Sequence, residues 1–168
     1  MSQLVLIAHN LRSTHNVGSL LRTAEGLGVS KVWLTGYTPY PPHESDERLP
    51  HLQRKTATQI TKTALGTEEL VAWQHASAVE PVLDELKSQG FVIAALEQAP
   101  KAVLLPDFQP PDKLALIVGR EVEGVEPELL RRCDVIIEIP MQGRKESFNV
   151  VQAAAMALYH FRFIGQRL

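Results

Sequence analysis

Three short stretches of the sequence combine glycine with hydrogen-bonding side chains, and each follows an apolar run. The first, HNVGSLLRTAEGLGV, contains Asn16, Gly18 and Arg22. Asn16 is a residue type that caps helices, and Gly18 would let another backbone or a phosphate approach closely. Arg22 follows about one turn later on the same predicted helix. Taken alone, this stretch is better explained as a capped helix with a solvated arginine.

The second stretch, GREVEG, contains Gly119, Glu121 and Gly124 and comes directly after an apolar run. A glycine at the end of a strand leaves backbone N–H and C=O groups open to a ligand. Glu121 adds a carboxylate at the same edge. A glycine-containing turn explains the pattern as well. It is not the dinucleotide-binding fingerprint, which requires G-x-G-x-x-G at the start of a helix.

The third stretch begins with IPMQG at 139–143 and continues with ESFNV at 146–150. We expect Ser147 to cap the last helix and the Asn149 amide to point back toward the preceding loop. The alanine-rich run 153–157 gives this helix a small-residue face that permits close packing. The alternative is a capped terminal helix that packs on a sheet without any further role.

The rest of the sequence supplies the elements that would position these stretches. Apolar runs typical of buried strands occur at 4–8, 31–34, 69–73, 91–95, 114–118 and 135–139. Helical patterns occur at 16–28, from about 54 to 63 after a polar, proline-rich loop at 36–54, and at 76–89 and 148–163.

This alternation predicts an α/β domain with a mainly parallel sheet and helices on both faces. Near-continuous apolar strands are typical of sheets covered on both sides. Ligands of such folds bind beyond the carboxyl ends of the strands. We therefore expect a site among the loops that follow Ala8, Ala95, Val118 and Ile139.

Composition and charge limit the possible functions. Hydrophobic residues make up 45% and charged residues 21% of the 168 residues, as in an ordinary globular protein. A net charge of −2 does not by itself favour nucleic-acid binding, so any basic surface must be gathered on one face or completed by a second subunit. Cys133 is the single cysteine, which excludes an internal disulfide, and the six histidines lack metal-ligand spacing. We expect no metal, no signal peptide and no membrane span, and a cytoplasmic location.

Together, and in this order, the three stretches resemble the TrmH-type branch of the SPOUT superfamily of RNA methyltransferases. The family motif N-x-G-x-x-x-R-x-A is matched by Asn16, Gly18, Arg22 and Ala24, and G-x-E-x-x-G is matched by the second stretch. The motif I-P-M followed by S-[LM]-N-[LV] is matched by 139–141 and 147–150, with Phe148 where the family usually has Leu or Met. The resemblance covers nearly the whole chain.

The resemblance implies a single SPOUT domain over residues 1–168, with a deep C-terminal trefoil knot and no appended RNA-binding domain. It also implies a homodimer that contacts through the last helix and the first motif, with Arg22 of one subunit facing the cofactor of the other. S-adenosyl-methionine would be the cofactor. Its implied contacts are Leu96, Gly119, Ile139, Met141, Ser147 and Phe148.

The implied reaction is methyl transfer to a ribose 2′-hydroxyl of tRNA or rRNA, with Arg22, Glu121, Ser147 and Asn149 as catalytic residues. An arginine stays protonated in proteins, so Arg22 would grip a phosphate and stabilise the developing alkoxide rather than act as a base. Glu121 would orient Arg22 or neighbouring amides, and Ser147 and Asn149 would shape the pocket.

The implied partner is RNA, and the expected contacts are Arg12, Asn16, Arg48, Arg54, Lys55 and Arg144. The basic run 48–55 could form a phosphate-binding surface with Arg12, Arg144 and Lys145, although a solvated loop explains the run nearly as well. Three other functions remain open: methylation of a base or of a different RNA, a non-catalytic RNA-binding protein with the same fold, and an unrelated nucleotide-binding enzyme. The absence of the usual glycine-rich nucleotide loops argues against the last.

Overall fold

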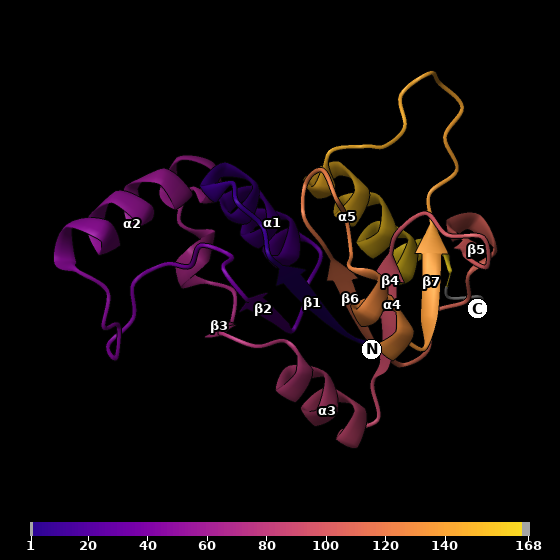
Figure 1. The fold of residues 1–168 in the computed structure, drawn as a ribbon, viewed down its shortest axis with the longest axis horizontal. Coiled ribbons are helices and arrows are strands. Elements are labelled where there is room, and N and C mark those ends of the chain that lie inside the picture. Colours follow the sequence, from indigo (N-terminus) through magenta and orange to yellow (C-terminus); the bar gives the residue numbers. More distant parts are fainter. Residues whose placement is uncertain (1, 166–168) are drawn as a thin grey trace.

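The computed structural model describes residues 2–165, and its centre is one parallel sheet of seven strands. The strand order is β3-β2-β1-β6-β4-β7-β5, and every pairing is parallel (Figure 1). The strands are β1 (Gln3–His9), β2 (Lys31–Thr35), β3 (Trp73–Ala76), β4 (Val92–Leu96), β5 (Val103–Leu104), β6 (Lys113–Val118) and β7 (Val135–Glu138).

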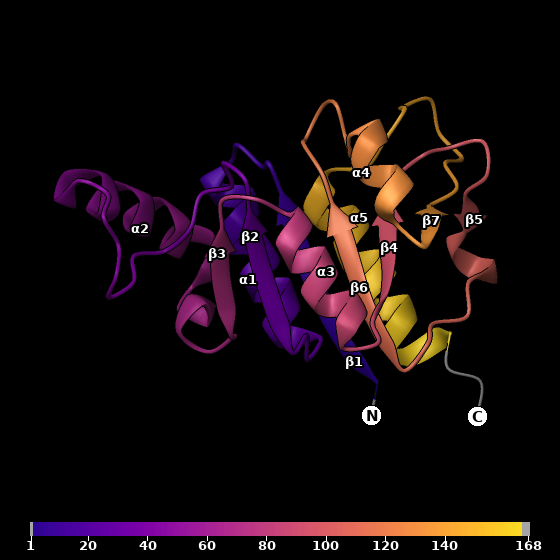
Figure 2. The same cartoon turned by 60° about the horizontal axis from the view of Figure 1, so that its bottom comes forward.

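Helices cover both faces of this sheet. On one face lie α1 (Thr14–Gly26), α2 (Pro50–Ala64) and α5 (Val150–Tyr159), and on the other lie α3 (Glu80–Ser88) and α4 (Pro127–Arg132) (Figure 2). The predicted α/β class, parallel sheet and two-sided helical cover are therefore confirmed. The trefoil knot stays a prediction.

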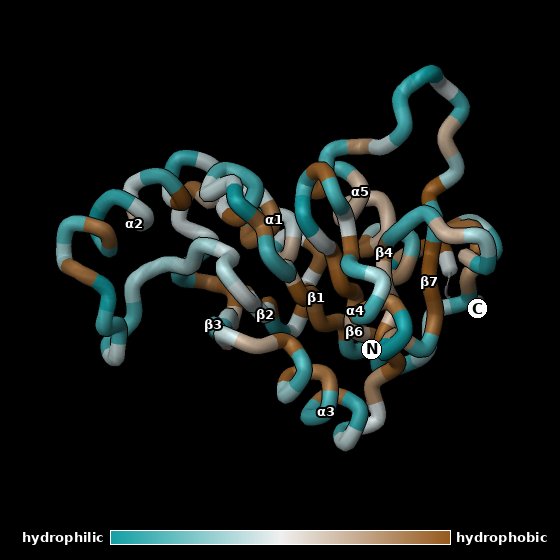
Figure 3. Tube along the Cα trace, in the orientation of Figure 1, coloured by the Kyte–Doolittle hydropathy of each residue, from teal (hydrophilic) through white to brown (hydrophobic). Residues whose placement is uncertain are grey.

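Strand β1 shows why the sheet is covered on both sides. Successive side chains of a strand point to opposite faces, and here both sets are apolar. Leu4, Leu6 and Ala8 pack in the core under α1, α2 and α5, whereas Val5 and Ile7 pack in the core under α3 and α4. Figure 3 shows β1 and β7 as hydrophobic segments between more hydrophilic loops.

Two predicted helix caps were wrong by two or three residues. Ser13, not Asn16, caps α1: its backbone is extended and its hydroxyl accepts a hydrogen bond from the Asn16 N–H at 3.1 Å. Asn149, not Ser147, caps α5, since its Oδ1 accepts from the Val151 N–H at 2.9 Å. The Asn16 and Ser147 side chains are thereby available for other contacts.

The predicted third strand and its following helix were misplaced, and two elements were missed. Leu70 is 72% exposed and precedes the strand, which begins at Trp73, because Gly66 adopts φ 94° and starts a 3-10 helix at Thr67–Glu69. Helix α3 starts at Glu80 instead of 76, since Pro81 favours the first turn of a helix.

The missed elements are β5 and α4, which are too short for a periodic signal. After Tyr159 the last helix continues as a π-helical turn, His160–Ile164.

The described residues include no helix that is long and apolar enough to cross a membrane. Nor do they hold a cluster of side chains suited to a metal ion.

Candidate active site

A pocket lies at the carboxyl ends of β6, β4 and β7, which are neighbours in the sheet. Its walls are the loop after β6, the turn after β4, the start of α5 and the long loop from β7 to α5, which projects at the top right of Figure 1. We call it the strand-end pocket. Its lining residues are Leu96–Gln98, Val118–Gly124, Ile139, Met141, Glu146–Phe148, Val150 and Ala153.

The six residues expected to contact a cofactor all line this one pocket. They are Leu96, Gly119, Ile139, Met141, Ser147 and Phe148. Three of them come from the ends of three different strands, and Phe148, which also lines the pocket, is 40% exposed. The structure thus brings together positions that are up to 52 residues apart in the sequence.

The loop after β6 needs its glycines for its own shape. Arg120 and Gly124 exchange two backbone hydrogen bonds, 3.1 and 3.0 Å long, which fold residues 119–125 into a tight turn. A Cβ on Gly119 would lie 2.5 Å from the backbone of Gly124. Gly119 therefore permits the loop to close on itself, besides exposing backbone to the pocket.

Glu97, which was not among the predicted site residues, fixes the same loop to β4. Its carboxylate accepts hydrogen bonds from the Val125 N–H at 2.9 Å and the Gln98 N–H at 2.8 Å. Its position directly after a buried strand is the sequence feature from which this role could have been predicted.

Glu121 joins the loop after β6 to the start of α1. Its carboxylate accepts hydrogen bonds from the Arg12 N–H at 3.2 Å, the Ser13 N–H at 3.0 Å and the Asn16 side-chain amide at 3.2 Å. Burial of the carboxyl group opposes its ionisation, but these hydrogen bonds outweigh that effect and hold the pKa of Glu121 below its ordinary value. Glu121 therefore orients neighbouring amides, and it has no hydrogen bond to Arg22 within residues 2–165.

Asn16 and Asn149 complete a polar chain along one side of the site. The Asn149 amide donates to the Asn16 Oδ1 at 3.4 Å, while Asn16 donates to Glu121. Asn149 also caps α5 and is not among the residues that line the pocket. One residue from each of the three stretches is thus linked by hydrogen bonds.

A second polar network, not expected from the sequence, surrounds the end of β1. Asn10 adopts φ 56°, and its side-chain amide donates to Glu126 at 3.2 Å while its oxygen accepts from the Tyr37 N–H at 3.1 Å. Glu126 pairs with Arg120 at 3.4 Å, and His9, whose pKa is lowered by burial, contacts Asn10 at 3.1 Å. This network holds the ends of β1 and β2 against the loop that follows β6.

Arg22 lies outside the strand-end pocket. It is exposed on α1 and lines a separate polar groove with Ser19, Thr23, Lys62, Thr63 and Val151. We call this the Arg22 groove. Within one subunit, therefore, the structure does not bring Arg22 to the pocket where Glu121 and Ser147 lie.

The residues expected to bind RNA do not form one compact patch. Arg54 and Lys55 are exposed on α2 and Arg144 is exposed on the loop before α5, and these two segments lie at opposite sides of the molecule in Figure 1. Arg12 pairs with Glu123 at 3.3 Å, and both side chains are largely exposed.

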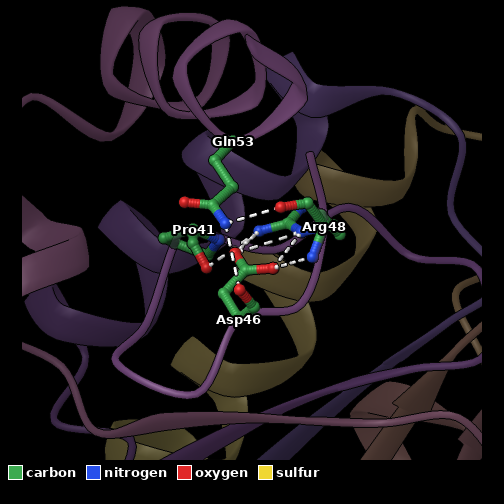
Figure 4. A network of polar contacts seen from close by, with 4 residues as sticks. All are labelled: Pro41, Asp46, Arg48 and Gln53. Carbon is green, nitrogen blue, oxygen red and sulfur yellow. Dashed lines mark hydrogen bonds and ion pairs between the residues drawn. The ribbon is translucent and has the colours of Figure 1, made fainter. Parts of the chain in front are cut away.

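Arg48 is engaged inside its own loop. It pairs with Asp46 at 2.6 Å, and the Gln53 side-chain amide donates hydrogen bonds to the backbone carbonyls of Asp46 and Arg48 (Figure 4). The Arg48 guanidinium also lies 3.7 Å from the Tyr40 ring centroid. The Asp46 carboxylate is only 1% exposed. Arg48 thus braces the segment before α2 instead of presenting its charge to solvent.

Comparison with known families gives one match that covers most of the chain. Residues 3–159 match the SpoU rRNA Methylase family. A Staphylococcus aureus protein named for the TrmH family of tRNA/rRNA methyltransferases is 32% identical over 156 residues, which are 92% of this chain and 56% of that protein. This chain thus spans little more than half the length of such relatives.

Solved structures share the fold over nearly the whole chain. An AdoMet-bound rRNA methyltransferase from Sinorhizobium meliloti superposes with a TM-score of 0.80 at 21% identity, over 96% of this chain and 57% of that one. An RNA 2′-O ribose methyltransferase superposes with a TM-score of 0.77 at 28% identity, over 95% of this chain and 55% of that one.

Proposed function

The chain belongs to the SpoU rRNA Methylase family, and on that basis we propose that it transfers a methyl group from S-adenosyl-methionine to a ribose 2′-hydroxyl of tRNA or rRNA. The observation that carries the proposal is the strand-end pocket, where all six expected cofactor contacts meet. The AdoMet-bound S. meliloti structure and the RNA 2′-O ribose methyltransferase share this fold and support the proposal.

The lining of the pocket fits S-adenosyl-methionine. The strand ends at Leu96, Gly119 and Ile139 offer backbone groups to an adenine edge, and Met141 and Phe148 offer apolar surface to its ring. Four glutamates and one arginine line the pocket, a balance that favours a positively charged sulfonium. When bound there, S-adenosyl-methionine supplies a methyl group that its sulfonium already activates.

The protein's own groups then have to hold the acceptor and stabilise its charge. Arg22 is the residue we assign to both tasks: its guanidinium grips a phosphate next to the target ribose and stabilises the negative charge that develops on the 2′-oxygen. Glu121 holds the start of α1, on which Arg22 is carried, through the Arg12 and Ser13 amides. Ser147 and Asn149 shape the approach between the pocket and α1.

A homodimer would reconcile the position of Arg22 with this reaction. Helix α5 and the turn after it expose Met156, Tyr159, Phe163 and Ile164, an apolar surface suited to a second copy. With α1 and α5 at the contact, Arg22 of one subunit would face the strand-end pocket of the partner. We propose this arrangement as part of the function.

Calorimetry with S-adenosyl-methionine and S-adenosyl-homocysteine tests the pocket first. Methyl-labelled cofactor is then incubated with unfractionated tRNA and with rRNA, and nucleosides are identified by mass spectrometry after digestion. We expect micromolar binding and label on a ribose. Label on a base instead of a ribose would show that the methyl acceptor is a base. Tight RNA binding without cofactor binding would overturn the enzymatic function in favour of an RNA-binding protein.

A further inference from the structure

The Arg22 groove has the composition of an anion-binding site. Arg22 and Lys62 supply two positive charges, and Ser19, Thr23 and Thr63 supply hydroxyl groups. No acidic residue of the described chain lines the groove, and none of the ion pairs found within residues 2–165 involves Arg22 or Lys62. Two cations gathered without a counter-charge favour an anionic ligand.

The packing of α1 on α2 builds the groove. Gly18 lets the helices approach so closely that an added Cβ would overlap the Ile60 carbonyl and the Thr63 hydroxyl. The Thr63 hydroxyl also donates to the His15 carbonyl at 2.8 Å, which joins the two helices beside the groove. The backbone positions of Lys62 and Arg22 are therefore fixed by contacts between two helices and not by loops.

The groove continues in both directions along polar helix faces. On α1, Asn16, Ser19 and Arg22 are three residues apart and share one face, which connects the groove to the Glu121 contact at the strand-end pocket. On α2, Lys55 and Lys62 are seven residues apart, two turns and about 10 Å along the same face. An extended, repeating anion matches such a track better than a single phosphate ion.

We propose that the Arg22 groove is a binding site for an RNA phosphodiester, with Lys62 as its second cation and Lys55 extending the contact to a further phosphate. The inference rests on the proposed function, because an RNA substrate is what brings phosphodiesters to this face. Lys62 is the new element: it belongs to none of the three sequence motifs. Ser19 and Thr23 hydroxyls donate to the non-bridging oxygens, and the lysine neutralises their charge.

The test measures binding of fluorescently labelled, unfractionated tRNA to the full chain as a function of salt. Phosphate contacts are independent of sequence, so this probe reports on the groove even when the physiological RNA is a different one. We expect Lys62→Ala to weaken binding roughly tenfold at about 50 mM salt and to lower the salt slope by about one. Lys62→Glu should weaken binding further, whereas Lys62→Arg should bind tRNA within about twofold of the wild-type affinity.

Arg131→Glu is the matched control, because Arg131 is exposed on α4, on the opposite face of the sheet. It makes the same change of charge as Lys62→Glu and should alter tRNA binding by no more than about twofold. S-adenosyl-methionine binding and thermal unfolding should match the wild type in every variant. In turnover, Lys62→Ala should raise KM for RNA more than it lowers kcat.

Binding of tRNA that Lys62→Glu leaves unchanged would overturn the groove assignment, and so would a wild type that fails to bind tRNA at low salt. A change in sedimentation of Lys62→Glu without a change in tRNA binding would point to a contact between subunits and would also overturn it. Wild-type tRNA binding that depends on Lys62 but is never followed by methyl transfer would preserve the groove and overturn the proposed reaction. The two proposals therefore fail separately.

Discussion

At the scale of single residues, Arg22 has the most specific assignment. It is exposed, it lies beside a second cation and it is separated from its own strand-end pocket. A guanidinium in this position can bind a phosphate and stabilise charge that develops nearby, but it cannot accept the proton of a hydroxyl group. This distinguishes an electrostatic role from that of a general base.

Arg22→Ala should lower the rate of methyl transfer by a factor on the order of 10²–10³, the usual effect of removing a group that stabilises developing charge. Cofactor affinity should stay within about twofold, because Arg22 does not line the pocket of its own subunit. Single-turnover transfer and calorimetry measure the two quantities. Near-normal transfer in this variant would exclude the assigned role. Partial recovery of the rate in Arg22→Lys would show that the positive charge accounts for part of the contribution of Arg22.

Asp46 provides a test of the loop before α2. The hydrogen bonds from Arg48 are the main cause that lowers the pKa of Asp46 to about 2. The folded pKa is thus below the unfolded value of about 3.9, so this stabilisation is present near neutral pH and is lost as the pH falls from about 5 to about 2. Asp46→Asn should lower Tm near pH 7, and its deficit relative to the wild type should shrink in acid.

The neighbouring Glu47→Gln serves as the control for Asp46→Asn, since Glu47 is exposed and also loses one negative charge. It should leave Tm nearly unchanged at both pH values. A deficit in Asp46→Asn that is equally large in acid would mean that shape, and not ionisation, explains the contribution of this residue.

The sequence predicted which residue types gather at the site but not all of their partners. The pattern that names Glu121 does not show that its carboxylate accepts hydrogen bonds from the Arg12 and Ser13 amides, because those residues are more than 100 positions away. Asn10 and Glu97 were missed for the same reason. Each acts through a contact made only when separate strand ends come together.

At the scale of elements, the close packing of α1 on α2 depends on one glycine. Gly18→Ala should destabilise the fold by about 1–3 kcal/mol, since its Cβ would overlap the Ile60 carbonyl and lie 2.9 Å from the Ala64 nitrogen. Gly26→Ala, on the same helix, meets no atom within 4 Å and should be neutral or stabilising by up to about 1 kcal/mol. Denaturant unfolding of both variants checks this, and equal effects would contradict the packing argument.

A second glycine pair tests the loop after β6. Gly119→Val should abolish S-adenosyl-methionine binding, because its side chain would enter the backbone of Gly124 and open the tight turn at 119–125. Gly143→Val lies in the β7–α5 loop with nothing within 4 Å of its Cβ and should bind nearly as well as the wild type. Calorimetry on both variants decides, and unchanged affinity in Gly119→Val would place the cofactor elsewhere.

At this scale, the elements with a clear run of apolar residues were the ones predicted correctly from the sequence. The strands at β1, β2, β4, β6 and β7 were found because each contains a run of apolar residues, which are mostly buried in the first four and partly buried in β7. The third strand was misplaced because Leu70 and Val71 look like strand residues, although they lie in the turn that follows the 3-10 helix Thr67–Glu69 and precede the strand. The order of the strands in the sheet is a property of long-range pairing that no local pattern contains.

At the scale of the whole molecule, the structure separates two sites that the proposed reaction must bring together. The strand-end pocket holds the expected cofactor contacts, while Arg22 and Lys62 lie in another groove. A homodimer with α1 and α5 at its contact would place each groove against the pocket of the partner subunit. In that arrangement neither subunit is complete, and the catalytic unit is the dimer.

Mixing two inactive variants tests this arrangement directly. Arg22→Ala retains an intact pocket, and Gly119→Val retains Arg22. If Arg22 acts on the partner's pocket, each mixed dimer contains one complete site, so random reassembly of equal amounts should restore about a quarter of the wild-type methyl transfer. If Arg22 acted on its own pocket, both sites of the mixed dimer would lack a component and no activity would return. Subunit exchange, measured by mass spectrometry of the intact dimers, must accompany the assay, because restored activity in proportion to the mixed species is the result that assigns Arg22 to the partner's site.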